Sequence, residues 1–157
     1  MTDSCDLDSS RPAEDLIDAL FAARRERRVD LAAAVELLLG HDSEVVRSEA
    51  VSLLLTKWRL PALRPQALTM IKDDPDAGVR ARAALGLAAI SNGFSRSDDA
   101  QTLAEVALGD GREAIERSAA VEGLARLAGR PAAIVSPASI SRALCATLIR
   151  EIEARID

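Results

Sequence analysis

The sequence predicts an all-α fold of stacked helix pairs, and three observations support this prediction. First, the pattern R-x-x-A-[VA]-x-x-L occurs three times, beginning at Arg47, Arg80 and Arg117, which are 33 and 37 residues apart. A recurrence at this spacing is typical of supersecondary units that stack on one another. Second, hydrophobic residues make up 48% of the chain but aromatic residues only 2%, a mixture that suits helices better than strands. Third, no strand-like alternation or hairpin signal competes with the helical pattern.

The N-terminal part of the chain is expected to hold a disordered segment and the first helix. Residues 1–10 are polar, so we expect them to be disordered and residues 11–157 to form a single domain. Pro12, followed by acidic residues, marks a helix start. The basic run at 24–28 ends this helix, because cations complement the negative end of the helix dipole. A site for a phosphate or an acidic partner is the alternative interpretation of this run.

The remaining helices are predicted from caps, breakers and apolar periodicity. Gly40 ends one helix, Pro61 ends another, and Gly109 lies in a tight turn. These signals predict three helix pairs and a final helix, with bounds of about 31–39 and 45–58, 63–72 and 77–90, 98–108 and 112–127, and 137–155. Short connections make paired helices antiparallel neighbours, and the extra helix at each end would cap an exposed apolar face.

Acidic residues precede each repeated arginine and indicate a structural role for it. The repeated residues lie on one face of the second helix of each pair, where small residues allow a neighbouring helix to approach closely. The arginine is expected to pack its stem between repeats and to carry its guanidinium to a turn carboxylate. We therefore predict a structural ladder that ties successive repeats together. Its members are Arg47, Arg80, Arg117, Asp42, Asp74 and Asp110.

The segment Asp74–Leu87 resembles a HEAT repeat of the short bacterial type, with Asp-Pro, Val-Arg, Ala-Ala and Leu at the family's positions. The copy at Asp42–Leu54 lacks the proline, and the copy at Asp110–Leu124 has Glu116 where valine is expected. The resemblance covers roughly residues 30–128. It implies a right-handed α-solenoid in which the second, or B, helices line a concave face. Members of this family usually bind proteins, and some resemble phycobilin lyase subunits or DNA-alkylation-repair glycosylases.

No residue pattern supports catalysis or the binding of a cofactor or metal. The chain has a single histidine, His41, at a helix–turn junction, where we expect it to form hydrogen bonds in the turn. The motifs G-x-S-x-G, H-E-x-x-H, G-x-x-x-x-G-K-[ST] and G-x-G-x-x-G do not occur. We therefore expect a protein that is not an enzyme, with no catalytic, cofactor-binding or metal-binding residue.

Charge and hydropathy bear on partners and location. The formal net charge is −5, which disfavours phosphate-backbone contacts and argues against nucleic acid as the partner. The N-terminus is acidic and lacks the apolar core of a secretory signal. No apolar run approaches the ~20 residues needed to cross a bilayer. We expect a cytoplasmic protein with no membrane association.

These observations predict a non-enzymatic protein–protein interaction module, such as a scaffold, adaptor or regulatory protein, that binds another protein through its concave B-helix face. The outward positions of the repeats are mixed and small, and they indicate neither a basic groove nor an aromatic cage. Trp58 is interpreted either as core or as a binding anchor, and Phe94, in the loop 91–97, either as an anchor or as covering the preceding helix. The expected binding surface comprises Glu49, Ser52, Arg82, Leu85, Glu122, Arg126, Trp58 and Phe94.

Two alternatives use the same scaffold. One is a nucleic-acid-binding or DNA-repair-type protein, for which Arg82 and Arg126 offer cations but no aromatic side chain accompanies them. The other is a lyase-like or chaperone-like subunit for a chromophore-bearing protein. A continuous positive groove would favour the first alternative, and a coloured partner would favour the second.

Overall fold

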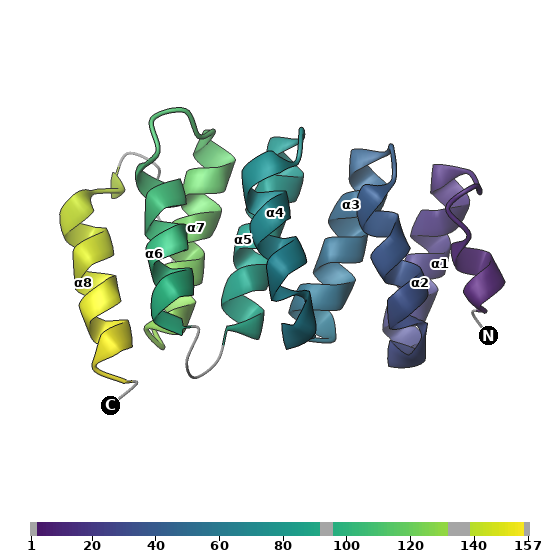
Figure 1. Cartoon of the computed structure of the whole chain (residues 1–157), viewed down its shortest axis with the longest axis horizontal. Coiled ribbons are helices and arrows are strands. Elements are labelled where there is room, and N and C mark those ends of the chain that lie inside the picture. Colours follow the sequence, from purple (N-terminus) through teal and green to yellow (C-terminus); the bar gives the residue numbers. More distant parts are fainter. Residues whose placement is uncertain (1–2, 92–95, 132–138, 156–157) are drawn as a thin grey trace.

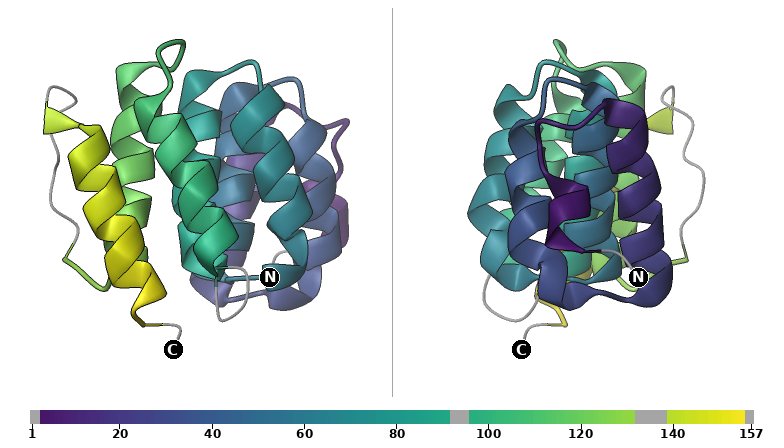
Figure 2. Two further views of the ribbon diagram at one scale, coloured as in Figure 1. Left: turned by 60° about the vertical axis from the view of Figure 1, so that its left-hand side comes forward. Right: turned by 90° about the vertical axis from the view of Figure 1, so that its right-hand side faces the viewer.

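The computed structural model describes residues 3–91, 96–131 and 139–155, and the regular secondary structure of this part is helical, without a strand. The helices stand side by side in chain order along the long axis of the molecule (Figure 1). In that view α2, α4, α6 and α8 form a front layer, and α1, α3, α5 and α7 lie behind them. The two layers are also visible from the N-terminal end of the stack (Figure 2). The predicted all-α solenoid is therefore confirmed.

Three helix pairs form the centre of the stack. The first helix of each pair, or A helix, lies in the front layer, and the B helix lies behind it. The A helices are α2 (Ala32–Leu37), α4 (Arg64–Asp73) and α6 (Arg96–Leu108), and the B helices are α3 (Glu44–Val51), α5 (Ala77–Ile90) and α7 (Ala114–Leu127). A π-helical segment, η4 (Ser52–Lys57), continues α3 to the end of the first B helix. The 3-10 segments η2 (Val29–Leu31), η3 (Leu38–Gly40) and η5 (Pro61–Leu63) border the first two A helices.

One further helix lies at each end of the stack. Helix α1 (Ala13–Glu26) packs against α3 and buries Leu16, Leu20 and Ala23. Helix α8 (Arg142–Glu153) packs against α6 and α7 and buries Leu148 and Ile152. The apolar side chains of both helices join one continuous core with the three pairs. The end helices thus cover the outermost pairs, as a stack of otherwise open units requires.

The N-terminal segment differs from its predicted disorder over the residues that are described. A 3-10 helix, η1 (Ser4–Leu7), precedes α1 and contacts both α1 and α2. The Leu7 side chain is 2% exposed and belongs to the core. A single leucine in a polar stretch carries no periodicity, which is why the sequence pattern gives no sign of this packing.

Two glycines allow the B helices to approach one another closely. A β-carbon at Gly86 in α5 would lie 2.7 Å from the Leu55 β-carbon in η4. A β-carbon at Gly123 in α7 would lie 3.2 Å from the Ala88 β-carbon in α5. Gly86 and Gly123 each stand six residues after a repeat arginine, and Leu55 and Ala88 each stand eight residues after the preceding one. The same register therefore joins successive B helices.

Candidate functional site

The first repeat arginine connects two successive turns. Arg47 Nε and Nη2 each donate a hydrogen bond of 2.9 Å to a different carboxylate oxygen of Asp74, in the turn before α5. Arg47 Nη1 donates to the carbonyl oxygens of His41 and Asp42, in the turn before α3, at 2.9 and 3.0 Å. All three nitrogens of the Arg47 guanidinium therefore donate hydrogen bonds within the protein, and they join the turns of two successive repeats.

Arg80 repeats this geometry with a different carboxylate. Its Nε and Nη2 donate to Glu116 at 2.8 and 2.9 Å, and its Nη1 donates to the carbonyl oxygens of Asp74 and Pro75 at 2.7 and 3.1 Å. Glu116 lies in the first turn of α7, at the position where the HEAT pattern has valine. Asp110, the ladder member expected in the turn before α7, is exposed there.

Glu116 is a buried carboxylate whose two oxygens each accept two hydrogen bonds. Besides Arg80, its donors are Arg112 Nη1 at 2.9 Å and the Glu113 backbone N–H at 3.0 Å. Burial by itself would raise the pKa of the Glu116 carboxyl. The hydrogen bonds from Arg80, the Glu113 amide and Arg112, together with the Arg80 charge, outweigh burial and lower this pKa from 4.5 to about 2. Glu116 is therefore ionised at neutral pH and serves as the anchor between the second and third pairs.

Arg117 and the carboxylate of Asp42 do not form the ladder contacts that the sequence predicts. Arg117 Nε donates to the carbonyl oxygen of Ala107, near the end of α6, at 3.0 Å. Asp42 contributes its backbone carbonyl rather than its carboxylate to Arg47. Of the predicted ladder, the structure thus brings Arg47 and Asp74 together through side chains. The carboxylates of Asp42 and Asp110 lie outside the arginine network, by which we mean Arg47 and Arg80 with their carboxylate partners Asp74 and Glu116.

A second buried carboxylate, Asp99 in α6, was not anticipated from the sequence. It is fully buried, and Arg64 at the start of α4 contacts its Oδ1 through Nε at 2.8 Å and Nη2 at 2.7 Å. The Ser91 hydroxyl, at the end of α5, donates to Asp99 Oδ2. Arg64 and Asp99 are 35 residues apart and match no motif, so only the fold brings them together.

A groove with a volume of about 200 Å³ crosses the B helices and is the candidate functional site. Each side chain that lines it comes from the B layer, namely from α1, η4, α5 and α7. The lining residues are Arg24, Ser52, Thr56, Lys57, Arg82, Leu85 and Arg126. Four of the seven are cations, and none is acidic. We call this feature the basic groove.

Most cations of the basic groove lack the carboxylate partners that Arg47 and Arg80 have. Arg24, Lys57 and Arg82 are exposed, and within the described part of the chain no carboxylate forms an ion pair with them. Arg126 forms an ion pair with Glu122, one turn earlier in α7. The groove therefore presents three cations that have no counter-ion among the described residues, in a chain whose net charge is −5.

The expected surface residues divide between the basic groove and its surroundings. Ser52, Arg82, Leu85 and Arg126 line the groove, and Glu122 lies beside it through its pair with Arg126. Glu49 is half-buried in α3 outside the lining. Trp58 is half-buried and packs against the core, and Phe94 lies outside the described residues.

The outward positions of the repeat contribute only one cation to the basic groove, Arg82. The others lie outside those positions, and Arg24 belongs to α1 and Lys57 to the end of η4. The alternative interpretation of the 24–28 run as a site for an acidic partner was the available signal for Arg24. Nothing in the repeat pattern singles out Thr56 or Lys57.

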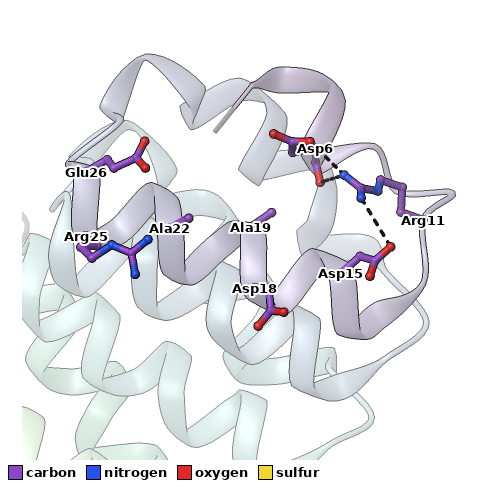
Figure 3. A pocket seen from close by; sticks show the side chains of 8 residues that line it. All are labelled: Asp6, Arg11, Asp15, Asp18, Ala19, Ala22, Arg25 and Glu26. Atoms are coloured by element: carbon purple, nitrogen blue, oxygen red, sulfur yellow. Dashed lines mark hydrogen bonds and ion pairs between the residues drawn. The ribbon is translucent and has the colours of Figure 1, made fainter. Parts of the chain in front are cut away.

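A second depression lies at the N-terminal end of the molecule, beside η1 and α1. It is lined by both charge types, and Arg11 lies between Asp6 and Asp15, at 3.1 and 3.4 Å (Figure 3). Asp18, Arg25 and Glu26 border its other side (Figure 3). Because Arg11 already pairs with two carboxylates and four of the lining residues are acidic, this depression offers less to an anionic ligand than the basic groove does.

Comparison with known proteins identifies the repeat. Among the described residues, every helix is too short or too polar to cross a membrane. Searches of curated proteins and of solved structures gave no match. A family model for HEAT repeats matches residues 31–125, which is more than half of the chain and includes all three arginine-containing repeats. The chain therefore belongs to the HEAT repeat family.

Proposed function

We propose that this protein is a non-enzymatic interaction module, a scaffold, adaptor or regulatory protein of the cytoplasm, that binds a partner protein with its B-helix face. HEAT repeats generally mediate protein–protein interaction. The observation that carries the proposal is the basic groove, in which no carboxylate of the described residues pairs with Arg24, Lys57 or Arg82. Arg47 and Arg80, in contrast, donate to carboxylates of the next repeat. Cations without internal partners, gathered on one face, are available to another molecule.

Cross-linking from inside the groove tests this proposal. A photoreactive benzoylphenylalanine replaces Leu85, which lines the groove, and in a matched protein it replaces Thr69, which is exposed on α4 in the opposite layer. Each protein is expressed in its native cell, irradiated, and examined by mass spectrometry. We expect one defined protein adduct from position 85 and none from position 69.

A charge reversal serves as the second arm of the experiment. Arg82→Glu in the position-85 protein should reduce the adduct, because Arg82 lines the same groove as the cross-linker. Adducts formed only from position 69, or nucleic-acid adducts from position 85, would contradict the proposal.

A further inference from the structure

Resting on that proposed function, we infer the chemistry of the partner: the basic groove binds an extended acidic segment of another protein, with its Asp or Glu carboxylates on Arg24, Lys57 and Arg82. Arginine guanidinium groups present planar pairs of N–H donors that match a carboxylate, and lysine adds a mobile point charge. Three cations around one groove, without a counter-ion among the described residues, are complementary to a run of negative side chains.

The size of the basic groove fits side chains rather than a ligand of drug-like size. Its volume is about 200 Å³, below the ~300–1,000 Å³ of typical small-molecule pockets. Ser52 and Thr56 lie among the cations and supply hydroxyl donors, and Leu85 supplies apolar surface for the methylenes of a bound side chain. One or two acidic side chains of an extended segment therefore occupy the groove, and the rest of the segment follows the B helices.

The Glu122 carboxylate already binds one cation of the basic groove within the chain. Its carboxylate pairs with Arg126 at the edge of the groove, four residues along α7. It thereby holds one of the four groove cations and adds a negative charge close to where an acidic ligand binds. An incoming carboxylate competes with Glu122 for Arg126, so removal of the Glu122 charge should strengthen binding rather than weaken it.

The surroundings of the groove favour a peptide over nucleic acid. Binding of a phosphate backbone requires a longer basic track, and single strands also require aromatic stacking surfaces. Among the described residues no aromatic side chain lines the groove, and Glu122 lies beside it. The molecule as a whole carries a net charge of −5.

The test measures binding of a short fluorescein-labelled peptide of alternating glutamate and alanine to the full chain by fluorescence anisotropy at low salt. We expect salt-sensitive binding that Arg82→Glu weakens roughly tenfold or more and Glu122→Gln strengthens by about threefold. Arg142→Glu changes the net charge as Arg82→Glu does, but on the exposed start of α8 away from the groove, and it should leave affinity nearly unchanged. Unchanged circular dichroism spectra show that the variants are folded.

Three results would overturn the inference: equal binding of a glutamine–alanine peptide, equal weakening by Arg142→Glu, or tighter binding of a single-stranded oligonucleotide than of the acidic peptide. If the cross-linker at position 85 captures a protein but the acidic peptide does not bind, this inference fails and the proposed function stands. If the peptide binds with the expected variant pattern but no protein is captured, the chemistry of the groove is supported and the proposed function fails.

Discussion

Arg47 and Arg80 use the same atoms for the same purpose, which explains why the repeat pattern retains arginine. In each, Nε and Nη2 form one edge that holds a carboxylate of the next repeat, and Nη1 holds two carbonyl oxygens of its own turn. A planar guanidinium has donors on both edges, whereas a lysine ammonium has no fixed plane. The carbonyls lie five and six residues before the arginine in both cases.

Glu116 shows how a departure from the repeat pattern preserves the same connection. The third turn has glycine at the position that Asp74 occupies in the second, so it lacks that carboxylate. The carboxylate enters instead from the first turn of α7, where it also accepts the Glu113 N–H as part of a capping box. The glutamate at the valine position of the repeat pattern therefore supplies the carboxylate that the third turn lacks.

Arg80→Ala should destabilise the protein much more than Arg82→Ala. Arg80→Ala leaves the buried Glu116 charge without its main partner, and breaking a buried pair costs about 3–5 kcal/mol. Arg82 lies two residues away in α5 and is exposed, so its removal should change the unfolding free energy by less than about 0.5 kcal/mol. Urea denaturation measures both values, and equal effects would disprove the role of Arg80 in joining the repeats.

Stability should depend on the ionisation of Glu116 at acid pH. Its pKa is about 2 in the folded protein against an ordinary 4.5, so its stabilising contribution is complete above pH 4.5 and is lost as the pH falls toward about 2. The Glu116→Gln variant lacks this contribution. The difference in unfolding free energy between the native protein and Glu116→Gln should therefore shrink as the pH falls below 4.5. A difference that stays constant with pH would show that this carboxyl has no lowered pKa.

At the scale of the helix, small residues determine how closely the B helices pack. Gly86 faces the β-carbon of Leu55, which cannot move without its backbone, whereas the nearest atom to a β-carbon at Gly123 is a Leu103 methyl group at 3.1 Å. Gly86 and Gly123 occupy the same position of the repeat, but they differ in how much room they leave for an added β-carbon. The α5–η4 contact is therefore the tighter of the two.

Gly86→Ala should destabilise the protein by about 1–3 kcal/mol through overpacking, despite the higher helix propensity of alanine. Gly123→Ala should cost less, because its nearest neighbours, a Leu103 methyl group at 3.1 Å and the Ala88 β-carbon at 3.2 Å, are farther away than the 2.7 Å contact at Gly86. Gly40→Ala is the control, since nothing lies within 4 Å of its added β-carbon. Thermal or urea unfolding of the three variants should rank them in this order, and a stabilised Gly86→Ala would refute the close approach.

At the scale of the whole molecule, each helix pair contacts mainly its neighbours. The apolar faces of the two outermost pairs are therefore covered by α1 and α8. The buried side chains Cys145, Leu148 and Ile152 of α8 cover the apolar faces of α6 and α7. Burial also raises the pKa of the Cys145 thiol. In such a stack, stability is close to the sum of unit and interface terms.

Removal of residues 132–157, which include α8, should lower the melting temperature and increase the binding of a hydrophobic dye, because the α6–α7 face becomes exposed. Amide exchange should accelerate most in α6 and α7 and least in α1 and α3, since coupling passes between neighbours. Removal of residues 154–157 alone is the control and should have little effect. Uniformly faster exchange would contradict the nearest-neighbour description.

The candidate site could be predicted only in part from the sequence. The repeat register placed Ser52, Arg82 and Leu85 on the outward side of the B helices, and the structure brings them into one groove. The same register could not assign Arg24 or Lys57, because neither occupies a repeat position. Their proximity depends on where α1 and η4 end relative to α5, which is a property of packing rather than of local pattern.

The sequence by itself determined the helical units, the turns between them and the expectation that the repeated arginines reach turn carboxylates, because periodicity, caps and the repeated arginine are local signals. Only the tertiary structure decided that Glu116 replaces Asp110, that Asp99 holds Arg64, and that cations from four helical segments form the basic groove. The physical reason is the stack itself. Side chains thirty or more residues apart become neighbours across adjacent helices, and small residues such as Gly86 set how near those helices come.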